Sequence, residues 1–446
     1  MTEAAGRWIE VRALLDRQPI GGFHRRIVAL STLLMLIDGF DVFMIGKLAP
    51  AIAAGFGETP AAMARVFLFQ QIGLAIGAFA MGPLADARGR KAVLMLSMAV
   101  FGTLTLAIPF ARTLGEVAVL RGVSSVFLGG VVPNVCALMA ELCPARRRST
   151  FLSILFVGYS AGGAGGALVA AFLLDRYGWQ SGFWIGGTVP LVLLLLYWRL
   201  VPESPQVQAR RNPHDPRIAR TLMRLEPDPA LLDAAFYNEE DRGAASRPRV
   251  GPAALFTDGR LPSTMLLWAA NLLSMANIAL LGAWMPTFFQ EMGGISIQRF
   301  ALVSMLTFAG GITGTMSIGP LMDRMRPHRV LAAIFLLNAV ALAAIGHLPF
   351  GTVAFAVALT LTGFSQSGGQ AGLNAIVAGA YPAAARATGF SWAGGAGRIG
   401  GVIAPLLGGL ALSSHLALGP TFLFIALPPL GVIVAVLALE RLTRRG

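Results

Sequence analysis

Charged side chains are scarce in this sequence. Asp, Glu, Lys and Arg make up 13% of its 446 residues, against about 25% in a typical soluble domain. Hydrophobic residues account for 55%, more than a core surrounded by water can hold. Apolar runs of about 18 residues or more recur along the chain, and each is long enough for a helix that crosses a bilayer. The composition therefore excludes a soluble protein and predicts an all-α polytopic membrane protein.

Cysteine and histidine are also rare. Cys136 and Cys143 lie on one expected helix, which separates them by about 10 Å, too far for a disulfide. The five histidines are scattered, so the sequence indicates no metal-ligand cluster. It contains no nucleophile–base set either. We therefore expect neither an enzyme nor a bound metal or organic cofactor.

Lysine is nearly absent, with two residues against 33 arginines, and the net charge is +13. This charge does not indicate nucleic-acid binding, because the basic residues gather in one set of loops. Twelve spans are expected, at roughly 27–48, 61–82, 92–110, 115–142, 150–174, 181–201, 262–290, 298–322, 329–349, 352–380, 387–412 and 418–440. One side then holds 28 basic residues and the other holds Lys47, Arg65, Arg112, Arg176 and Arg299. The positive-inside rule places both termini in the cytoplasm.

The spans divide into two halves of six. The expected divisions are an N-terminal cytoplasmic segment at 1–26, six-helix halves at 27–201 and 262–440, a cytoplasmic linker at 202–261 and a tail at 441–446. The N-terminal segment is polar and rich in arginine, so we expect no cleavable signal peptide. The linker is rich in Pro, Arg and acids, and its stretch 216–225 predicts a short surface helix.

Two sequence matches relate the halves. The stretch Gly82–Asp86 returns as Gly319–Asp323, 237 residues later, and Pro144–Thr150 returns as Pro382–Thr388, 238 residues later. Matches at nearly the same offset predict two six-helix pseudo-repeats. Parallel repeats about an axis normal to the membrane describe the major facilitator fold, in which substrate binds near the midplane between the halves.

The first copy of the repeated loop, Gly82 to Lys91, resembles the loop signature of the major facilitator superfamily. Physically it is a tight turn whose acid and bases can form a charge latch that breaks when the halves rock. The resemblance implies a cytoplasmic gate formed by Asp86, Arg88, Arg90, Asp323, Arg324, His328 and Arg386. The sequence departs from the family at Ala87, where a basic residue is usual. For His328, a solvated loop histidine is the alternative.

A narrower resemblance covers almost the whole chain. Its pieces include Asp38-Gly-Phe-Asp41, Arg121-Gly122, Trp179-Gln180, Pro202-Glu203-Ser204 and Gly397-Arg398-Ile-Gly400. Together they resemble the aromatic acid:proton symporter family, whose members take up benzoate-type acids, hydroxybenzoates, protocatechuate and gallate, and in some cases phenylpropionates or muconate. The resemblance implies import of an aromatic carboxylate with the proton as coupling ion.

Two acids share the first span. Asp38 and Asp41 lie on one helix face, about 4.5 Å apart along the axis. A charge at that depth is costly, so we expect both to face the bundle interior or a wet cavity and to mark a substrate or proton path. Counting residues along the spans places Arg121 at the depth of Asp41 and Arg398 near that of Asp38.

These depths suggest a coupling mechanism. A substrate carboxylate that competes for an arginine would free an aspartate to take up a proton. We hypothesise that Asp38 and Asp41, with Arg121, form the proton-coupling and gating site, and that the fork of Arg398 receives the substrate carboxylate. A purely structural role in helix packing is the alternative for each. Glu141 is assigned to the gating set, and its place near Arg146–Arg148 favours a cytoplasmic salt-bridge latch.

Other polar and aromatic side chains could line the cavity. The expected substrate-binding residues, beside Arg398, are Tyr159, Asn271, Trp284, Gln366, Gln370 and Trp392. Gln366, Gln370 and Asn374 repeat every four residues and share a helix face, although interhelical hydrogen bonding is an equal alternative. The glycine-rich run 158–166 predicts close approach of the fifth span to a neighbour.

The sequence thus predicts a monomeric, proton-coupled transporter of a small organic acid in the bacterial cytoplasmic (inner) membrane, working by alternating access. An importer of a non-aromatic acid such as muconate, or a drug exporter, would differ only in the lining of its cavity. A non-transporting membrane sensor on the same fold would carry a signalling domain or a long tail, and we expect neither here.

Overall fold

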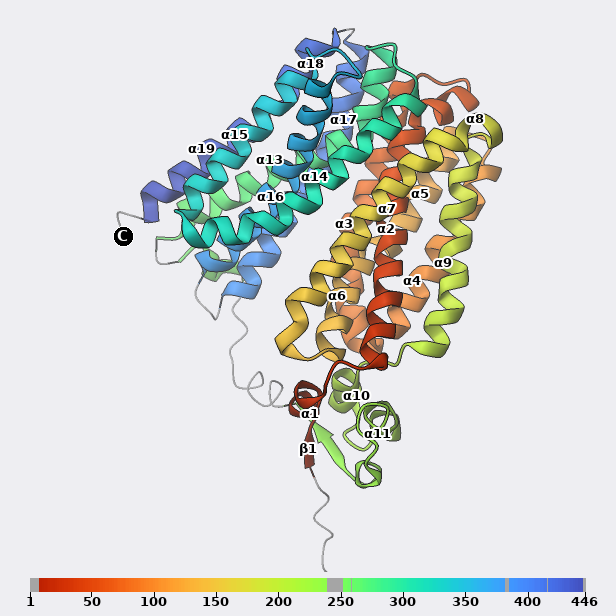
Figure 1. Ribbon diagram of the computed structural model, residues 1–446, viewed down its shortest axis with the longest axis vertical. Coiled ribbons are helices and arrows are strands. Elements are labelled where there is room, and N and C mark those ends of the chain that lie inside the picture. The colour runs from red at the N-terminus through yellow and green to blue at the C-terminus, as the bar shows by residue number, and fades with distance from the viewer. Residues whose placement is uncertain (1–7, 239–251, 258, 382–384, 415, 444–446) are drawn as a thin grey trace, which may run out of the picture.

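The computed structural model describes residues 8–238, 252–257, 259–381, 385–414 and 416–443, and its architecture is helical (Figure 1). Eleven spans among these residues are long and apolar enough to cross a membrane. They are α2 (Gly22–Gly55), α3 (Met63–Arg88), α4 (Arg90–Ala107), α5 and α6 (Leu114–Gly129, Val131–Leu142), α7 (Arg148–Phe172), α9 (Gln180–Leu200), α13 (Leu261–Glu291), α14 (Ile297–Arg324), α15 (Pro327–Ile345), α17 (Arg386–Ser413), and α18 and α19 (Leu418–Ile425, Leu427–Thr443).

A twelfth long helix, α16 (Val353–Ala380), packs along α14 and α15. Its 28 residues are enough to cross a bilayer. It is less apolar than the others because the stretch from Ser365 to Gln370 contains only Ser, Gln and Gly. Lipid does not have to solvate this stretch, because Ser365, Gly368, Gly369 and Gln370 are buried against other helices.

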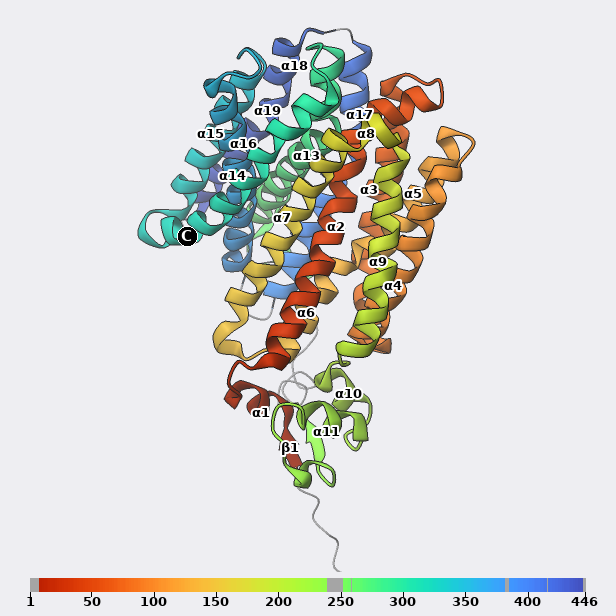
Figure 2. The same cartoon turned by 45° about the vertical axis from the view of Figure 1, so that its right-hand side comes forward.

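The helices form two groups, α2–α9 and α13–α19 (Figures 1 and 2). We call the end of the molecule that carries α10 (Pro205–Arg211) and α11 (Pro216–Leu222) the linker side, and the opposite end the far side. The two groups adjoin near the far side and diverge toward the linker side, as Figure 1 shows. The hydrophobic cluster at the far side contains buried residues of both groups, among them Leu48, Phe67, Trp284 and Phe289.

Glycines set the distance between helices in each group. A Cβ atom added at Gly39 or Gly162 would overlap backbone atoms of the facing helix, Tyr159 for the first and Leu36 for the second. Helices α2 and α7 therefore pack backbone against backbone, which confirms the close approach predicted from the glycine-rich run. Because α7 leaves no space for side chains there, Gly39 stands between the two acids of α2.

A small subdomain on the linker side joins the N-terminal segment to the linker. Strand β1 (Trp8–Glu10) pairs in parallel with β2 (Ala235–Tyr237). Helices α1 (Val11–Arg17), α10 and α11 cover this pair, and their buried side chains form a separate hydrophobic cluster. The helix predicted at 216–225 is confirmed as α11. The structured N-terminal segment was not expected, because a three-residue strand leaves no readable alternation in the sequence.

The subdomain is fixed to the α2–α9 group by polar contacts. Arg12 donates to the carbonyl of Ala140 at 2.7 Å, Asp16 accepts from the backbone of Ala145 at 2.7 Å, and Arg146 donates to the carbonyl of Gln18 at 2.9 Å. The first two bonds satisfy backbone groups at the end of α6 and in the turn that follows it, and the third satisfies the carbonyl of Gln18 after α1.

The glycine contacts give a stability test. Replacing Gly162 with alanine should force α2 and α7 apart and lower the free energy of unfolding by about 1–3 kcal/mol. Gly379→Ala is the matched control, because a Cβ there meets no atom within 4 Å. Thermal unfolding of the purified variants in detergent measures the difference. An equal midpoint for both variants would show that α2 and α7 do not depend on this contact.

Candidate functional site

The centre of the α2–α9 group is a fully buried ion pair. The Nη1 of Arg121, on α5, lies 2.7 Å from Oδ2 of Asp41, on α2, and its Nη2 donates to the Asp41 carbonyl at 2.7 Å. The side chains are 0% and 1% exposed. The predicted pairing of Asp41 with Arg121 is confirmed. Two contacts from one guanidinium fix α2 against α5 and offset part of the cost of removing both charges from water.

Asp38 lies one turn from Asp41 but has different electrostatic surroundings. Its side chain is 2% exposed, and its Oδ1, like that of Asp41, has no hydrogen-bond partner among the described residues. Unlike Asp41, Asp38 also has no salt bridge among these residues. Arg398 and Arg121 attract its negative charge, and Asp41 repels it. A buried carboxylate with an unsatisfied oxygen is unusual, and protonation would remove its charge and supply a donor.

Arg398 approaches Asp38 from the other half. It lies on α17 with an exposed side chain, and Asp38 and Tyr159 are its electrostatic partners. Tyr159 lies on α7, half-buried, with its ring 5.8 Å from that of Phe43. A basic group of one half thus faces an acid of the other half. Its guanidinium remains open to an anionic ligand, since the described residues place no salt bridge on it.

The predicted amide residues form a hydrogen-bonded cluster between α13 and α16. Gln370 accepts from Ser274 at 2.7 Å and donates to Asn271 at 3.3 Å and to Asn374 at 3.1 Å. Gln366 donates to Asn277 at 3.3 Å. Apart from the Gln370–Asn374 bond within α16, these are the interhelical bonds that the sequence left as an alternative. Any contact with substrate would use the hydrogen-bonding capacity that these amides have left. Their binding role stays a prediction.

The two predicted tryptophans lie in different environments. Trp284 is fully buried, donates to the carbonyl of Pro405 at 3.1 Å and meets Phe67 of the other half edge-on at 5.1 Å. It packs the far-side cluster and offers no surface to a ligand in this conformation. Trp392 is 46% exposed and stacks on Trp268 at 5.7 Å. Trp392 is therefore the one of this pair that can contact a ligand here.

On the linker side, Asp86, Arg90 and Glu141 form a salt-bridge latch, in which the arginine that pairs with Glu141 is not one of those expected. Arg90 bridges Asp86 at 2.7 Å and Glu141 at 3.3 Å, and also donates to Asn134 at 3.4 Å. The salt-bridge latch predicted for Glu141 is confirmed with Arg90 as its partner, whereas the nearby Arg146 and Arg148 donate to backbone carbonyls. The latch joins α3, α4 and α6 within one half, while Arg88 is exposed.

The second copy of the repeated loop is more exposed to solvent than the first. Asp323 and Arg324 end α14 with exposed side chains, and His328 is half-buried and engaged in an interaction. The neighbouring Arg329 contacts Glu440 at 3.5 Å. Arg386 begins α17, and its side chain lies outside the described residues. The gate roles of these residues stay predictions.

One buried charge, that of Lys47, was not predicted from the sequence. The sequence count placed Lys47 among the basic residues of one membrane face, yet its side chain is 4% exposed inside the bundle. Its ammonium lies 5.8 Å from the ring centre of Phe43 and 5.0 Å from that of Phe308, on α14 of the other half. Its place six residues after Asp41 was the signal that could have assigned it to the interior.

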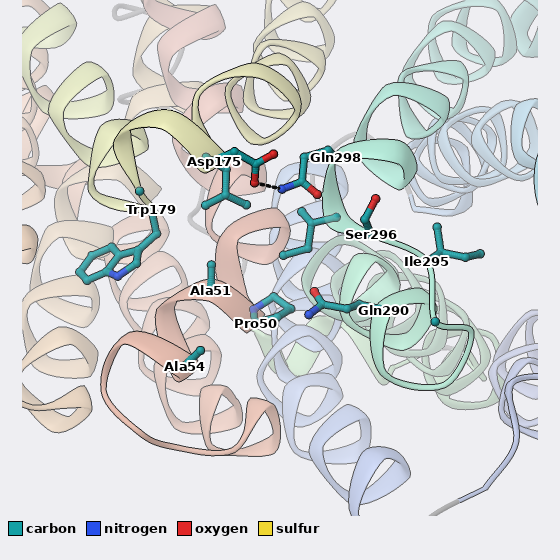
Figure 3. A pocket seen from close by; sticks show the side chains of 13 residues that line it. Pro50, Ala51, Ala54, Asp175, Trp179, Gln290, Ile295, Ser296 and Gln298 are labelled. Atoms are coloured by element: carbon teal, nitrogen blue, oxygen red, sulfur yellow. Dashed lines mark hydrogen bonds between the residues drawn. The ribbon is translucent and has the colours of Figure 1, made fainter.

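A cavity of about 610 Å³ opens between the halves on the far side (Figure 3). Pro50, Ala51 and Trp179 line it from one half, and Gln290 and Ile295 from the other. Asp175, in α8 (Leu174–Tyr177), accepts a hydrogen bond from Gln298 across the cavity. This bond ties the two halves together on the far side. The cavity is separate from the charged centre, because neither Asp38 nor Arg398 lines it.

Comparisons with known proteins match this chain to transporters. A family model described as Major Facilitator Superfamily matches residues 31–352 and 267–445. A gallate transporter of Pseudomonas putida is 36% identical over 96% of this chain and 95% of its own, and the 4-hydroxybenzoate transporter PcaK of the same species is 32% identical over 86% and 85%. The inward-open structure of the Escherichia coli xylose transporter XylE is similar in fold, with a TM-score of 0.73, 15% identity and coverage of 94% and 96%.

The buried pair predicts a large and partner-dependent effect on stability. Arg121→Met should cost about 3–5 kcal/mol, because it leaves the Asp41 carboxylate buried without a counter-charge. The double variant D41N/R121M should regain part of this loss. Arg65→Met is the control: its pair with Glu58, at 3.4 Å, is exposed and should contribute about 0–1 kcal/mol.

Thermal unfolding of the four proteins in detergent separates these cases. If the double variant is no more stable than R121M, the two side chains do not act as a compensating pair.

Proposed function

The chain belongs to the major facilitator superfamily of membrane transporters, and we propose that it imports an aromatic carboxylate together with protons. Relatives that match almost the whole chain are named gallate, 4-hydroxybenzoate and benzoate transporters, at 29–36% identity, which supports a benzoate-type substrate. Two groups suited to such a substrate lie near Asp38: the exposed guanidinium of Arg398, and the ring of Tyr159.

The observation that carries the coupling proposal is that Asp38 is buried without a salt bridge among the described residues, whereas Asp41 is held by Arg121. Arg398 and Arg121 are the positive charges that act on Asp38, and of these only Arg398 is not already held by Asp41. A substrate carboxylate that binds the Arg398 fork takes over that charge, and the buried Asp38 is then more stable with a proton. Asp41 cannot exchange in the same way, because both contacts of Arg121 hold it. Binding of substrate and of a proton therefore favour each other.

Alternating access would use the contacts between the halves. We assign the linker side to the cytoplasm, following the excess of arginine in its loops, with both termini there and the protein in the bacterial inner membrane. The conformation described is then closed toward the outside, by the Asp175–Gln298 bond and the far-side cluster, and diverges toward the cytoplasm. We expect each monomer to contain a complete pathway, since both halves come from one chain.

The proposal predicts gradient-driven uptake. Vesicles with an acidic exterior should accumulate labelled 4-hydroxybenzoate, and a protonophore should abolish the accumulation. Asp38→Asn should lose accumulation but keep counterflow exchange of substrate, because a neutral amide binds no exchangeable proton. Uptake of benzoate, gallate and muconate, measured in the same vesicles, ranks the substrates.

Glu58→Gln is a control for general damage, since that carboxylate is exposed and belongs to neither the charged centre nor the gate. Wild-type uptake that is indifferent to the protonophore would refute symport. Full gradient-driven accumulation by Asp38→Asn would refute the role of Asp38.

A further inference from the structure

Lys47 is a cation in the interior, and no carboxylate of the described residues forms a salt bridge with it. It is one of only two lysines in the chain, and its side chain is 4% exposed. Its ammonium donates to the Phe43 carbonyl at 3.3 Å, and the described residues place no salt bridge on it. An ammonium group is strongly hydrated in water. Burial with one carbonyl contact therefore leaves most of its hydrogen-bonding capacity unused.

Two aromatic rings compensate for part of this loss. Phe43 lies one turn before Lys47 on α2, and Phe308 lies on α14, so the cation lies between rings of the two halves. Cation–π contacts of this kind contribute about 0.5–2 kcal/mol, less than a charged hydrogen-bond partner in a dry site. Phe308 also packs edge-on against Phe43, at 5.3 Å between ring centres.

Lys47 lies at a contact that must open during transport. The adjacent Gly46 packs against the backbone of Gly282 and Ala283 on α13, and Pro50, one turn further along α2, lines the far-side cavity. When the halves separate on the far side, Phe308 moves away with its half. Lys47 then has a water-filled path toward the outside and lacks one of its two aromatic partners.

A chain of contacts connects Lys47 with the central site. Phe43 contacts both Phe308 and Tyr159, and Tyr159 is an electrostatic partner of Asp38 and Arg398. The rings of Phe308, Phe43 and Tyr159 thus connect the surroundings of the two cations. Lys47 is nearer the outside by about 9 Å than Asp41, at helical rise.

We propose that Lys47 is an outer carboxylate-binding residue, which captures an aromatic carboxylate from the outside before the carboxylate passes to Arg398. The proposal rests on the proposed function and adds an asymmetry to it. Lys47 binds the substrate when the far side is open, and Phe308 replaces the substrate when that side is closed. Lys47 therefore contributes to affinity at the outer face and not at the inner face.

The test measures KM from both faces. Lys47→Met removes the charge and keeps an unbranched side chain that is one atom shorter. In right-side-out vesicles it should raise the KM for 4-hydroxybenzoate about tenfold, the loss of one charged hydrogen bond. In inside-out vesicles the KM should change less than about twofold, because Lys47 does not contribute to affinity at the inner face. Arg65→Met, which removes an exposed cation outside the gate, is the control, and it should leave both KM values unchanged.

A chemical rescue provides a second readout if Lys47→Met does not reach the membrane. Lys47→Cys is made with both native thiols, Cys136 and Cys143, replaced by serine. An aminoethyl methanethiosulfonate reagent, applied from outside, restores a cation at this position and should lower the outer KM again. The neutral methyl reagent should not.

The outcomes separate this inference from the proposed function. If wild-type vesicles take up no aromatic carboxylate, the proposed function fails. If wild-type uptake is normal but Lys47→Met changes the KM equally at both faces, or at neither, only the outer binding role is overturned. Rescue by the neutral reagent would overturn it as well.

Discussion

The ion pair between Asp41 and Arg121 anchors the charged centre of this transporter. Both side chains are withdrawn from water, and each would be prohibitively costly to bury alone. Their two contacts, both at 2.7 Å, fix α2 against α5 inside one half. With one acid neutralised in this way, the other acid of the same helix face, Asp38, is left without a fixed partner and can respond to a ligand.

The structure places its fixed ion pairs within one half, and it places the charge contacts that can change between the two halves. Asp41–Arg121 and the Asp86–Arg90–Glu141 latch lie within the first half and can move with it as a unit. Asp38 with Arg398, and Lys47 with Phe308, lie across the interface that alternating access must rearrange. The backbone contacts at Gly39 and Gly162 keep α2 and α7 rigid, so rocking of the halves changes the second set and spares the first.

Much of this could be predicted from the sequence because lipid restricts what a chain can do. A spanning helix needs a long apolar run, so most helix bounds agree within a few residues, although α2 and α3 extend well beyond their predicted ends at 48 and 82. A buried acid needs a base at its depth, so Asp41–Arg121 was identified. What failed depends on side-chain direction. The sequence could not show that Glu141 would meet Arg90, that Trp284 would pack into the far-side cluster, or that Lys47 would point inward, since neighbours on other helices decide each case.

Proton uptake on substrate binding tests the central claim most directly. Purified protein in weakly buffered detergent is mixed with 4-hydroxybenzoate, and a pH-sensitive dye reports the proton balance. If the substrate carboxylate takes the charge of Arg398 from Asp38, the wild type removes protons from solution as it binds, and Asp38→Asn binds substrate without removing any. Binding without proton uptake by the wild type, or equal uptake by Asp38→Asn, would contradict this account.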